Sequence, residues 1–97
     1  MRDLCRIHVH DVAFSPADAR RRARGVVGFA TVSLNGSVRV SGFKVWRDPE
    51  GIYSVSFPTK RDRLGKYHVV LEPLGPAARR SIEGQILDAL REQGVLP

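Results

Sequence analysis

Hydrophobic and polar residues alternate over much of the chain, which is the pattern that predicts half-buried β-strands. Residues 5–14 alternate in this way. Residues 26–34 and 38–47 are rich in β-branched and aromatic side chains, and an Asn35-Gly36 pair lies between them. Both residues of such a two-residue turn must accept a positive φ, which Asn and Gly do most easily. We therefore expect one strand followed by a β-hairpin.

The second strand of this hairpin changes phase part-way along. Val38 and Val40 alternate with polar residues, and the alternation resumes one residue out of step on Phe43 and Val45. The slip falls at Gly42, a residue that tolerates the backbone conformation of an extra, unpaired position. The pattern predicts a β-bulge at Gly42.

Turn residues divide the remainder of the chain. Residues 48–51 (Asp-Pro-Glu-Gly) predict a β-turn before a strand at 53–57, and a fifth short strand is expected at 67–71. Residues 15–25 have two interpretations. Ser15 would cap a short helix there, whereas a long hairpin loop bracketed by Pro and Gly fits the same residues equally well.

One amphipathic helix is expected over residues 76–93. Pro76 suits a first helical position, and Gly94 suits a position just past the last. Apolar residues recur between them at three- and four-residue spacing, namely Ala78, Ile82, Ile86, Ala89 and Leu90. The predicted fold is a single α+β domain over residues 1–97, with a small antiparallel sheet of four or five strands followed by this helix. Because one helix covers one face of a sheet, we expect a homodimer to cover the other.

Positive charge is concentrated in three short segments. The 97 residues include 16 Lys and Arg against 10 Asp and Glu, a net charge of +6. Residues 20–24 contribute +4, residues 60–66 contribute +3, and Arg79 with Arg80 contributes +2, which leaves −3 for all other residues. Basic segments on an otherwise acidic chain indicate a surface for a polyanion such as nucleic acid. The alternative is that these arginines only keep a small protein in solution.

Composition excludes several other classes of protein. Hydrophobic residues at 42% and charged residues at 27% are globular values, so the chain is not wholly disordered. No apolar run approaches the roughly 18–20 residues of a transmembrane span. The single Cys5 cannot form an internal disulfide, and we therefore expect a cytoplasmic protein with no membrane partner.

Candidate catalytic and metal-binding side chains are sparse. Cys5 lies near His8 and His10 in the chain, but it faces away from both on a strand, and His68 belongs to a distant segment. A metal site needs three or four converging ligands. There is also no nucleophile motif and no Gly-rich phosphate loop. We expect no enzymatic activity, no metal and no cofactor.

The most informative segment is the basic loop at residues 60–66, whose cations can spread along a phosphate backbone. Arg79 and Arg80 lie in the first turn of the predicted helix, where they oppose the helix dipole but form an anion site with its free N–H groups. Tyr67 either stacks on a base or only begins the fifth strand. The candidate nucleic-acid-binding residues are Lys60, Arg61, Arg63, Lys66, Arg79 and Arg80, with a secondary basic loop of Arg20, Arg21, Arg22 and Arg24.

Several short motifs follow one another in a fixed order along the chain. They are Leu34-Asn35, Phe43-Lys44-Val45, Pro58-Thr59-Lys60-Arg61, Gly65, Tyr67, Pro73 and Arg79-Arg80-Ser81-Ile82. In their order and spacing they resemble the stage V sporulation protein G (SpoVG) family, and the resemblance covers roughly residues 6–91.

The resemblance implies a bacterial cytoplasmic homodimer with a small sheet and a C-terminal helix. It also implies a site-selective DNA-binding regulator that binds RNA as well and is linked to septation and developmental gene control. By position, Lys60 and Arg61 match the family's basic loop, and Arg79 matches the Arg at its helix start. His68-Val69 stands where the family has an Arg-Asp pair, so base preference is expected to differ even where phosphate contacts are kept.

Two hypotheses of different kinds follow. The first is a dimeric nucleic-acid-binding regulator in which residues 60–66 and the helix start form one basic face, with an affinity that falls steeply as salt rises. The alternative is a protein-interaction module that acts on the cell-division machinery, with the basic loop at 20–24 binding an acidic partner. A purely structural dimer is a third possibility.

Overall fold

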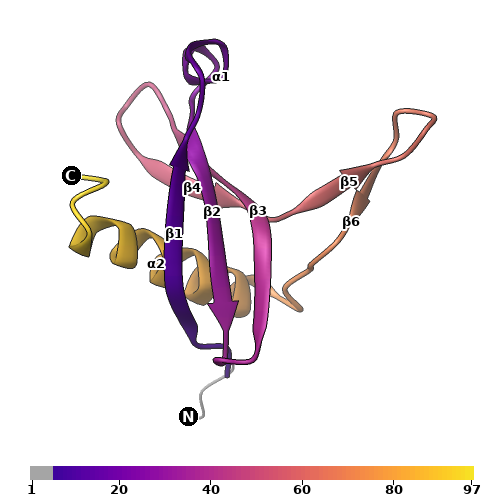
Figure 1. Ribbon diagram of the computed structural model, residues 1–97, viewed down its shortest axis with the longest axis vertical. Helices are drawn as coiled ribbons and strands as arrows, with labels where there is room; N and C mark the ends of the chain where they lie inside the picture. The colour runs from indigo at the N-terminus through magenta and orange to yellow at the C-terminus, as the bar shows by residue number, and fades with distance from the viewer. Residues whose placement is uncertain (1–5) are drawn as a thin grey trace.

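The computed structural model describes residues 6–97, and its elements form the predicted α+β fold (Figure 1). Four strands make an antiparallel sheet in the order β1-β2-β3-β4, and two further strands form a separate hairpin. The elements are β1 (Val9–Pro16), α1 (Ala19–Ala23), β2 (Val26–Leu34), β3 (Val38–Arg47), β4 (Tyr53–Ser56), β5 (Thr59–Arg61), β6 (Tyr67–Val69) and α2 (Pro76–Glu92). No helix within residues 6–97 is long and apolar enough to cross a membrane.

The turn that joins β2 to β3 has the predicted form. Asn35 has a φ of 53° and Gly36 a φ of 67°, and the N–H of Ser37 donates to the carbonyl of Leu34 at 3.0 Å. The predicted bounds of 26–34 and 38–47 coincide with the two strands that this turn connects. Asn35 Oδ1 also accepts a hydrogen bond from the N–H of His8 at 2.7 Å, so the turn holds the segment that enters β1.

The strand register of the sheet shifts at three places, one between β1 and β2 and two between β2 and β3. Gly42 has a φ of 95° and lies where the β2–β3 register shifts, which confirms the predicted bulge. The other two shifts were not predicted: Asp11 has a φ of 51° where the β1–β2 register shifts between His10 and Ala13, and the β2–β3 register shifts again between Val26 and Gly28. The predicted first strand at 5–14 is therefore wrong in its bounds, since β1 runs from Val9 to Pro16. Residue 5 lies outside the described residues.

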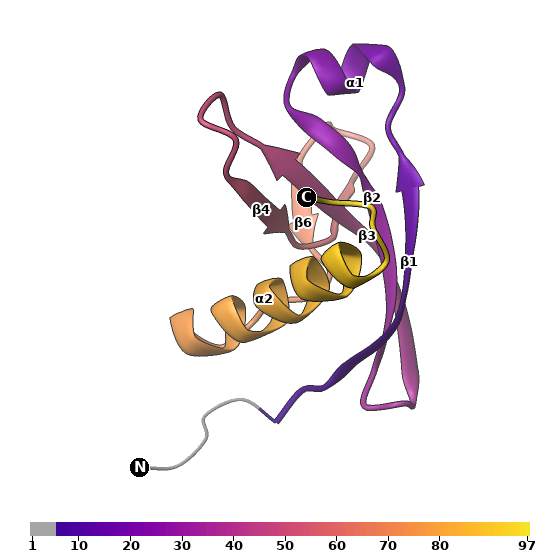
Figure 2. The same ribbon diagram turned by 90° about the vertical axis from the view of Figure 1, so that its left-hand side faces the viewer.

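Helix α2 packs on one face of the sheet and supplies four of the twelve buried core residues (Figure 2). It begins and ends where predicted to within one residue, and the amide of Gly94 donates to the carbonyl of Arg91 just past its end. The residues of this core with less than 2% exposure and the largest volumes are Phe43, Val32, Val45, Val55, Ile86 and Leu90. Ile82 and Leu87 are also buried along the helix, so the predicted apolar stripe faces the sheet.

One close approach in this core depends on glycine. A Cβ placed on Gly28 of β2 would lie 2.3 Å from the Phe14 ring and 2.5 Å from the carbonyl oxygen of Ser15. Phe14 belongs to β1 and packs against the core from across the strand pair. The absence of a side chain at Gly28 therefore lets the Phe14 ring lie directly over β2.

Polar side chains of α2 bind backbone groups on both edge strands of the sheet. Gln85 Oε1 accepts from the N–H of Val9 at 2.8 Å. Gln93, the C-cap residue of α2, donates through Nε2 to the carbonyl of Val12 in β1 at 2.8 Å. On the opposite edge, Glu83 Oε2 accepts from the N–H of Val55 in β4 at 2.7 Å. These groups have no partner strand, so the helix satisfies hydrogen bonds that the sheet leaves open.

Residues 15–25 contain the short helix α1, so of the two interpretations the helical one is correct. Its cap is Asp18, whose Oδ1 accepts from the N–H of Arg21 at 2.9 Å, rather than Ser15. Ser15 belongs to β1. The backbone hydrogen bond from Arg21 is the largest cause that holds the pKa of Asp18 below its ordinary value.

Residues 59–69 form a hairpin that diverges from β3 and projects away from the four-stranded sheet (Figure 1). The expected loop at 60–66 is therefore shorter, because its first two residues belong to β5. The expected fifth strand at 67–71 ends two residues early, at Val69, and pairs with β5 instead of joining the main sheet. β5 was missed because all three of its residues are polar and exposed, so it carries no alternation of burial.

Candidate nucleic-acid interface

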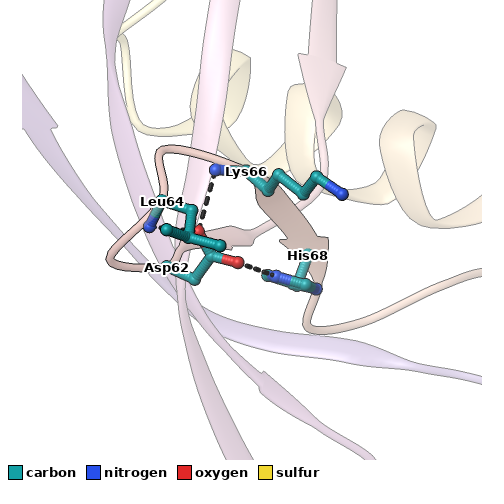
Figure 3. Close-up of polar contacts among 4 residues, drawn as sticks. All are labelled: Asp62, Leu64, Lys66 and His68. Carbon is teal, nitrogen blue, oxygen red and sulfur yellow. Dashed lines mark hydrogen bonds and ion pairs between the residues drawn. The ribbon is translucent and has the colours of Figure 1, made fainter.

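The tip of the β5–β6 hairpin is organised by one carboxylate (Figure 3). Asp62 Oδ1 accepts from the N–H groups of Leu64 and Lys66, each at 2.9 Å, and Asp62 Oδ2 lies 2.7 Å from His68 Nε2. The His68 hydrogen bond is the largest cause that lowers the pKa of Asp62 from its ordinary value of 3.8. This arrangement fixes the turn that carries Arg63 and Lys66.

The two faces of the hairpin carry different cations. Arg61 is paired with Tyr67 across the strands, and Lys60 is paired with His68. Because successive strand residues point to opposite faces, Arg61 and Lys60 face opposite ways. The Arg61 guanidinium lies 5.7 Å from the centre of the Tyr67 ring, and Tyr67 is 67% exposed. This cation and this aromatic ring are held side by side at the surface.

An aromatic side chain also lies on the sheet face opposite α2, which we call the outer face. Phe43, Val45 and Val55 point into the core, so the intervening residues of β3 and β4 point outward. Among them, the half-buried Trp46 donates its indole N–H to Ser56 Oγ at 2.8 Å. The hydrogen bond orients the ring across the β3–β4 pair.

Three arginines from three elements surround a hollow of about 450 Å³ beside this ring. Arg24 is the C-cap residue of α1, Arg47 is the last residue of β3, and Arg79 lies in the first turn of α2. Trp46 and Ser56 line the same hollow. Three segments far apart in sequence thus present guanidinium groups to one surface depression.

A second hollow, of about 430 Å³, lies between β3 and the hairpin. Its lining includes Lys44 and Ser56 from the outer face and Arg61 and Tyr67 from the hairpin. Ser56 belongs to both hollows. The two hollows therefore share a residue of the outer face, and we call their combined lining the basic groove.

The basic groove is poorly neutralised. Within residues 6–97, four of its five cations make no ion pair, namely Arg24, Lys44, Arg47 and Arg61. Arg79 Nη1 is 3.8 Å from Glu83 Oε1, a weak pair because it is long and Arg79 is half exposed, and Glu83 Oε2 accepts the backbone N–H of Val55 in β4. Asp48 lines the groove, and its carboxylate accepts the N–H of Ile52 at 2.8 Å. The surface is therefore set up to attract an anion.

The other predicted residues lie elsewhere. Arg80 is exposed and sits roughly 200° around α2 from the buried Ile82, so it faces away from the core. Arg20, Arg21 and Arg22 lie on α1, and Arg21 places its guanidinium 5.6 Å from the Phe29 ring. Arg22 lines a smaller hollow of about 190 Å³ that also includes Arg47.

Three groove residues were not predicted from the sequence. Lys44 and Arg47 are single charges outside the basic segments, and Trp46 is a single aromatic residue within a predicted strand. The signal available was the phase of β3: Lys44 and Trp46 alternate with the core residues Phe43 and Val45, which places both on the outer face. Their grouping with Arg24 and Arg79 depends on tertiary structure.

The fold belongs to a known class of small α+β proteins. The SpoVG family model matches residues 7–92, so the chain belongs to the SpoVG family. One relative, named "Putative septation protein SpoVG", comes from Archaeoglobus fulgidus. It is 34% identical over 68 residues, which cover 70% of this chain and 79% of the relative. The resemblance expected from the motifs is confirmed.

Proposed function

We propose that this SpoVG-family protein is a cytoplasmic regulator without catalytic activity that binds DNA or RNA and affects gene expression linked to septation or development. The observation that carries the proposal is the basic groove, in which five cations from β3, α1, α2 and the hairpin surround two hollows that share Ser56. Nucleic-acid affinity comes largely from neutralised phosphates, and arginine binds phosphate through two parallel hydrogen bonds.

The hairpin supports the same function. Outside the groove, the hairpin carries three more exposed cations: Lys60 on β5, and Arg63 and Lys66 in the turn. Asp62 holds that turn in one conformation. A preorganised basic arm loses little conformational freedom when it meets a phosphate backbone. The hairpin and the groove together offer a longer track of cations than either part alone.

The test is binding of the purified protein to a labelled duplex and to single-stranded RNA, over a salt series of about 50–300 mM. Micromolar or tighter binding that falls along a steep log–log slope supports the proposal. The double variant Lys60→Ala/Arg61→Ala should bind more than about tenfold more weakly, because two phosphate contacts are lost.

A matched control removes the same two charges elsewhere. Arg39 is exposed near the Asn35-Gly36 turn, and Arg91 is exposed near the end of α2. The Arg39→Ala/Arg91→Ala variant should keep most of the affinity. Equal losses in both double variants would mean that net charge, and not the hairpin, determines binding. No binding to either nucleic acid at the lowest salt would reject the proposal and favour an acidic protein partner in cell division.

We also propose that the protein acts as a homodimer. Outside the basic groove, four apolar side chains between residues 64 and 74 are more than half exposed, namely Leu64, Val69, Val70 and Leu74. Such a concentration of exposed apolar surface, on the β5–β6 hairpin and on the segment between β6 and α2, is typical of an interaction site. Sedimentation equilibrium should give twice the chain mass, and a monomer at all concentrations up to about 100 µM would exclude the dimer.

A further inference from the structure

We propose that the basic groove binds a single-stranded segment of nucleic acid and that Trp46 stacks on one of its bases. This inference rests on the proposed function and specifies the form of nucleic acid and the place where it binds. It starts from a side chain that the core does not use. Trp46 lies on the outer face of β3, whereas the core is filled from the opposite face.

The environment of Trp46 favours a stacking role. Its indole N–H already donates to Ser56 Oγ at 2.8 Å, so the polar edge of the ring is satisfied and its orientation is set. What the ring offers to a ligand is its apolar face. A flat base is the part of a nucleic acid that matches such a face, and stacking tolerates any base because each has a π surface.

Phosphate partners lie around this ring. Arg24, Arg47 and Arg79 line the same hollow as Trp46. A nucleotide strand alternates a base with a phosphate, and a surface that alternates an aromatic ring with cations matches that order. The arrangement of three guanidinium groups about one ring therefore fits a strand whose base turns inward and whose phosphates turn outward.

The second hollow repeats the arrangement. There the exposed ring of Tyr67 lies beside the Arg61 guanidinium, and Lys44 lies on the facing strand. Ser56 lines both hollows, so the proposed strand would run from the Trp46 ring past Ser56 to the Tyr67 ring. A duplex keeps its bases paired and stacked internally, so it would use the cations and leave both rings without a partner.

The chain itself carries the probe for this inference, since Trp46 is its single tryptophan. We would titrate the full chain with an oligothymidylate of about eight nucleotides and follow both tryptophan fluorescence and the anisotropy of a label on the oligonucleotide. Saturable quenching that tracks the anisotropy is expected. A blunt mixed-sequence duplex should change the anisotropy with little quenching.

Two substitutions at the ring separate stacking from folding. Trp46→Leu should weaken oligothymidylate binding by about 5- to 150-fold, whereas Trp46→Phe, which keeps an aromatic face, should recover most of the affinity. Should both variants unfold, Arg47→Ala keeps the ring. The Arg47→Ala variant should bind oligothymidylate more weakly by both readouts, tryptophan quenching and anisotropy. The matched control is Arg39→Ala, at the other end of β3 and roughly 25 Å away.

The outcomes distinguish the two proposals. Oligonucleotide binding without any change in tryptophan fluorescence, or equal affinity of the Leu and Phe variants, would overturn the stacking role and leave nucleic-acid binding intact. A fluorescence change that depends on protein concentration alone would show that a second copy of the chain covers Trp46, and the inference would fail. Absence of binding by both measurements to every nucleic acid would reject the proposed function itself.

Discussion

The salt dependence of binding can be predicted from the number of cations in the basic groove. Three arginines line the first hollow, and one lysine and one arginine line the second. If each of these five cations neutralises one phosphate of a single strand, the slope of log affinity against log salt is about −3.5. Affinity should then fall by about 130-fold between 50 and 200 mM salt.

Removing two of the cations tests this count. Arg24→Ala/Arg47→Ala leaves three phosphate contacts, which reduces the slope to about −2.1 and the loss over the same salt range to about 20-fold. Both side chains are exposed and make no ion pair within residues 6–97, so the fold should not change. Fluorescence anisotropy with a labelled oligothymidylate, over a salt series, gives both slopes.

The control is Arg39→Ala, which changes the net charge but lies outside the groove. Its slope should stay near −3.5. An unchanged slope for the double variant would refute the assignment of Arg24 and Arg47 to phosphate contacts, whatever its affinity at one salt concentration. If the slope for the unaltered protein is shallower than about −1, phosphate neutralisation is not the source of affinity.

Three further predictions concern the fold. Gly28→Ala should lower the free energy of unfolding by about 1–3 kcal/mol or more, since its methyl group would overlap the Phe14 ring and a backbone oxygen; urea denaturation with an unchanged midpoint would show that β1 shifts freely. Glu83→Ala should cost about 1–3 kcal/mol by leaving a part-buried N–H without its acceptor, and Glu83→Gln should cost less; equal midpoints for the two would contradict this. The lowered pKa of Asp62 means that its carboxylate stabilises the hairpin above pH 3.8 and that this contribution is lost as pH falls through the lowered value, so the amide signals of Leu64 and Lys66, which donate to this carboxylate, should show a transition below pH 3.8; the absence of a transition there would contradict the role given to Asp62.

The parts of the fold that could be predicted are those with a local chemical cause. Asn35 and Gly36 adopt positive φ, and so does Gly42, because these residue types accept that conformation. The bulge at Asp11 requires the same conformation from a residue that adopts it far less readily than Gly, so the sequence carries only a weak signal for it. β5 gives no signal either, since nothing in it is buried.

The candidate site was predictable only in part, for a related reason. Clusters of charge in sequence indicated Arg24, Arg61 and Arg79, each of which lines the basic groove. Arg47 is an isolated charge, and only the pairing of β3 with β4 and the hydrogen bond between its N–H and the Gly25 carbonyl bring it beside α1. Groupings that arise from tertiary contacts are not visible in a single sequence.

The hydrogen bonds that α2 makes to both edge strands have a consequence for association. Exposed strand edges are templates on which other chains can add, and proteins that leave them open are prone to aggregate. Here Gln85 occupies a backbone N–H of β1 and Glu83 one of β4, so side chains of a single helix obstruct growth of the sheet from either side. β5 and β6 form a two-stranded sheet of their own, whose outer edges face no third strand within residues 6–97. Strand addition between copies would therefore meet less obstruction at the hairpin than at the edges of the main sheet.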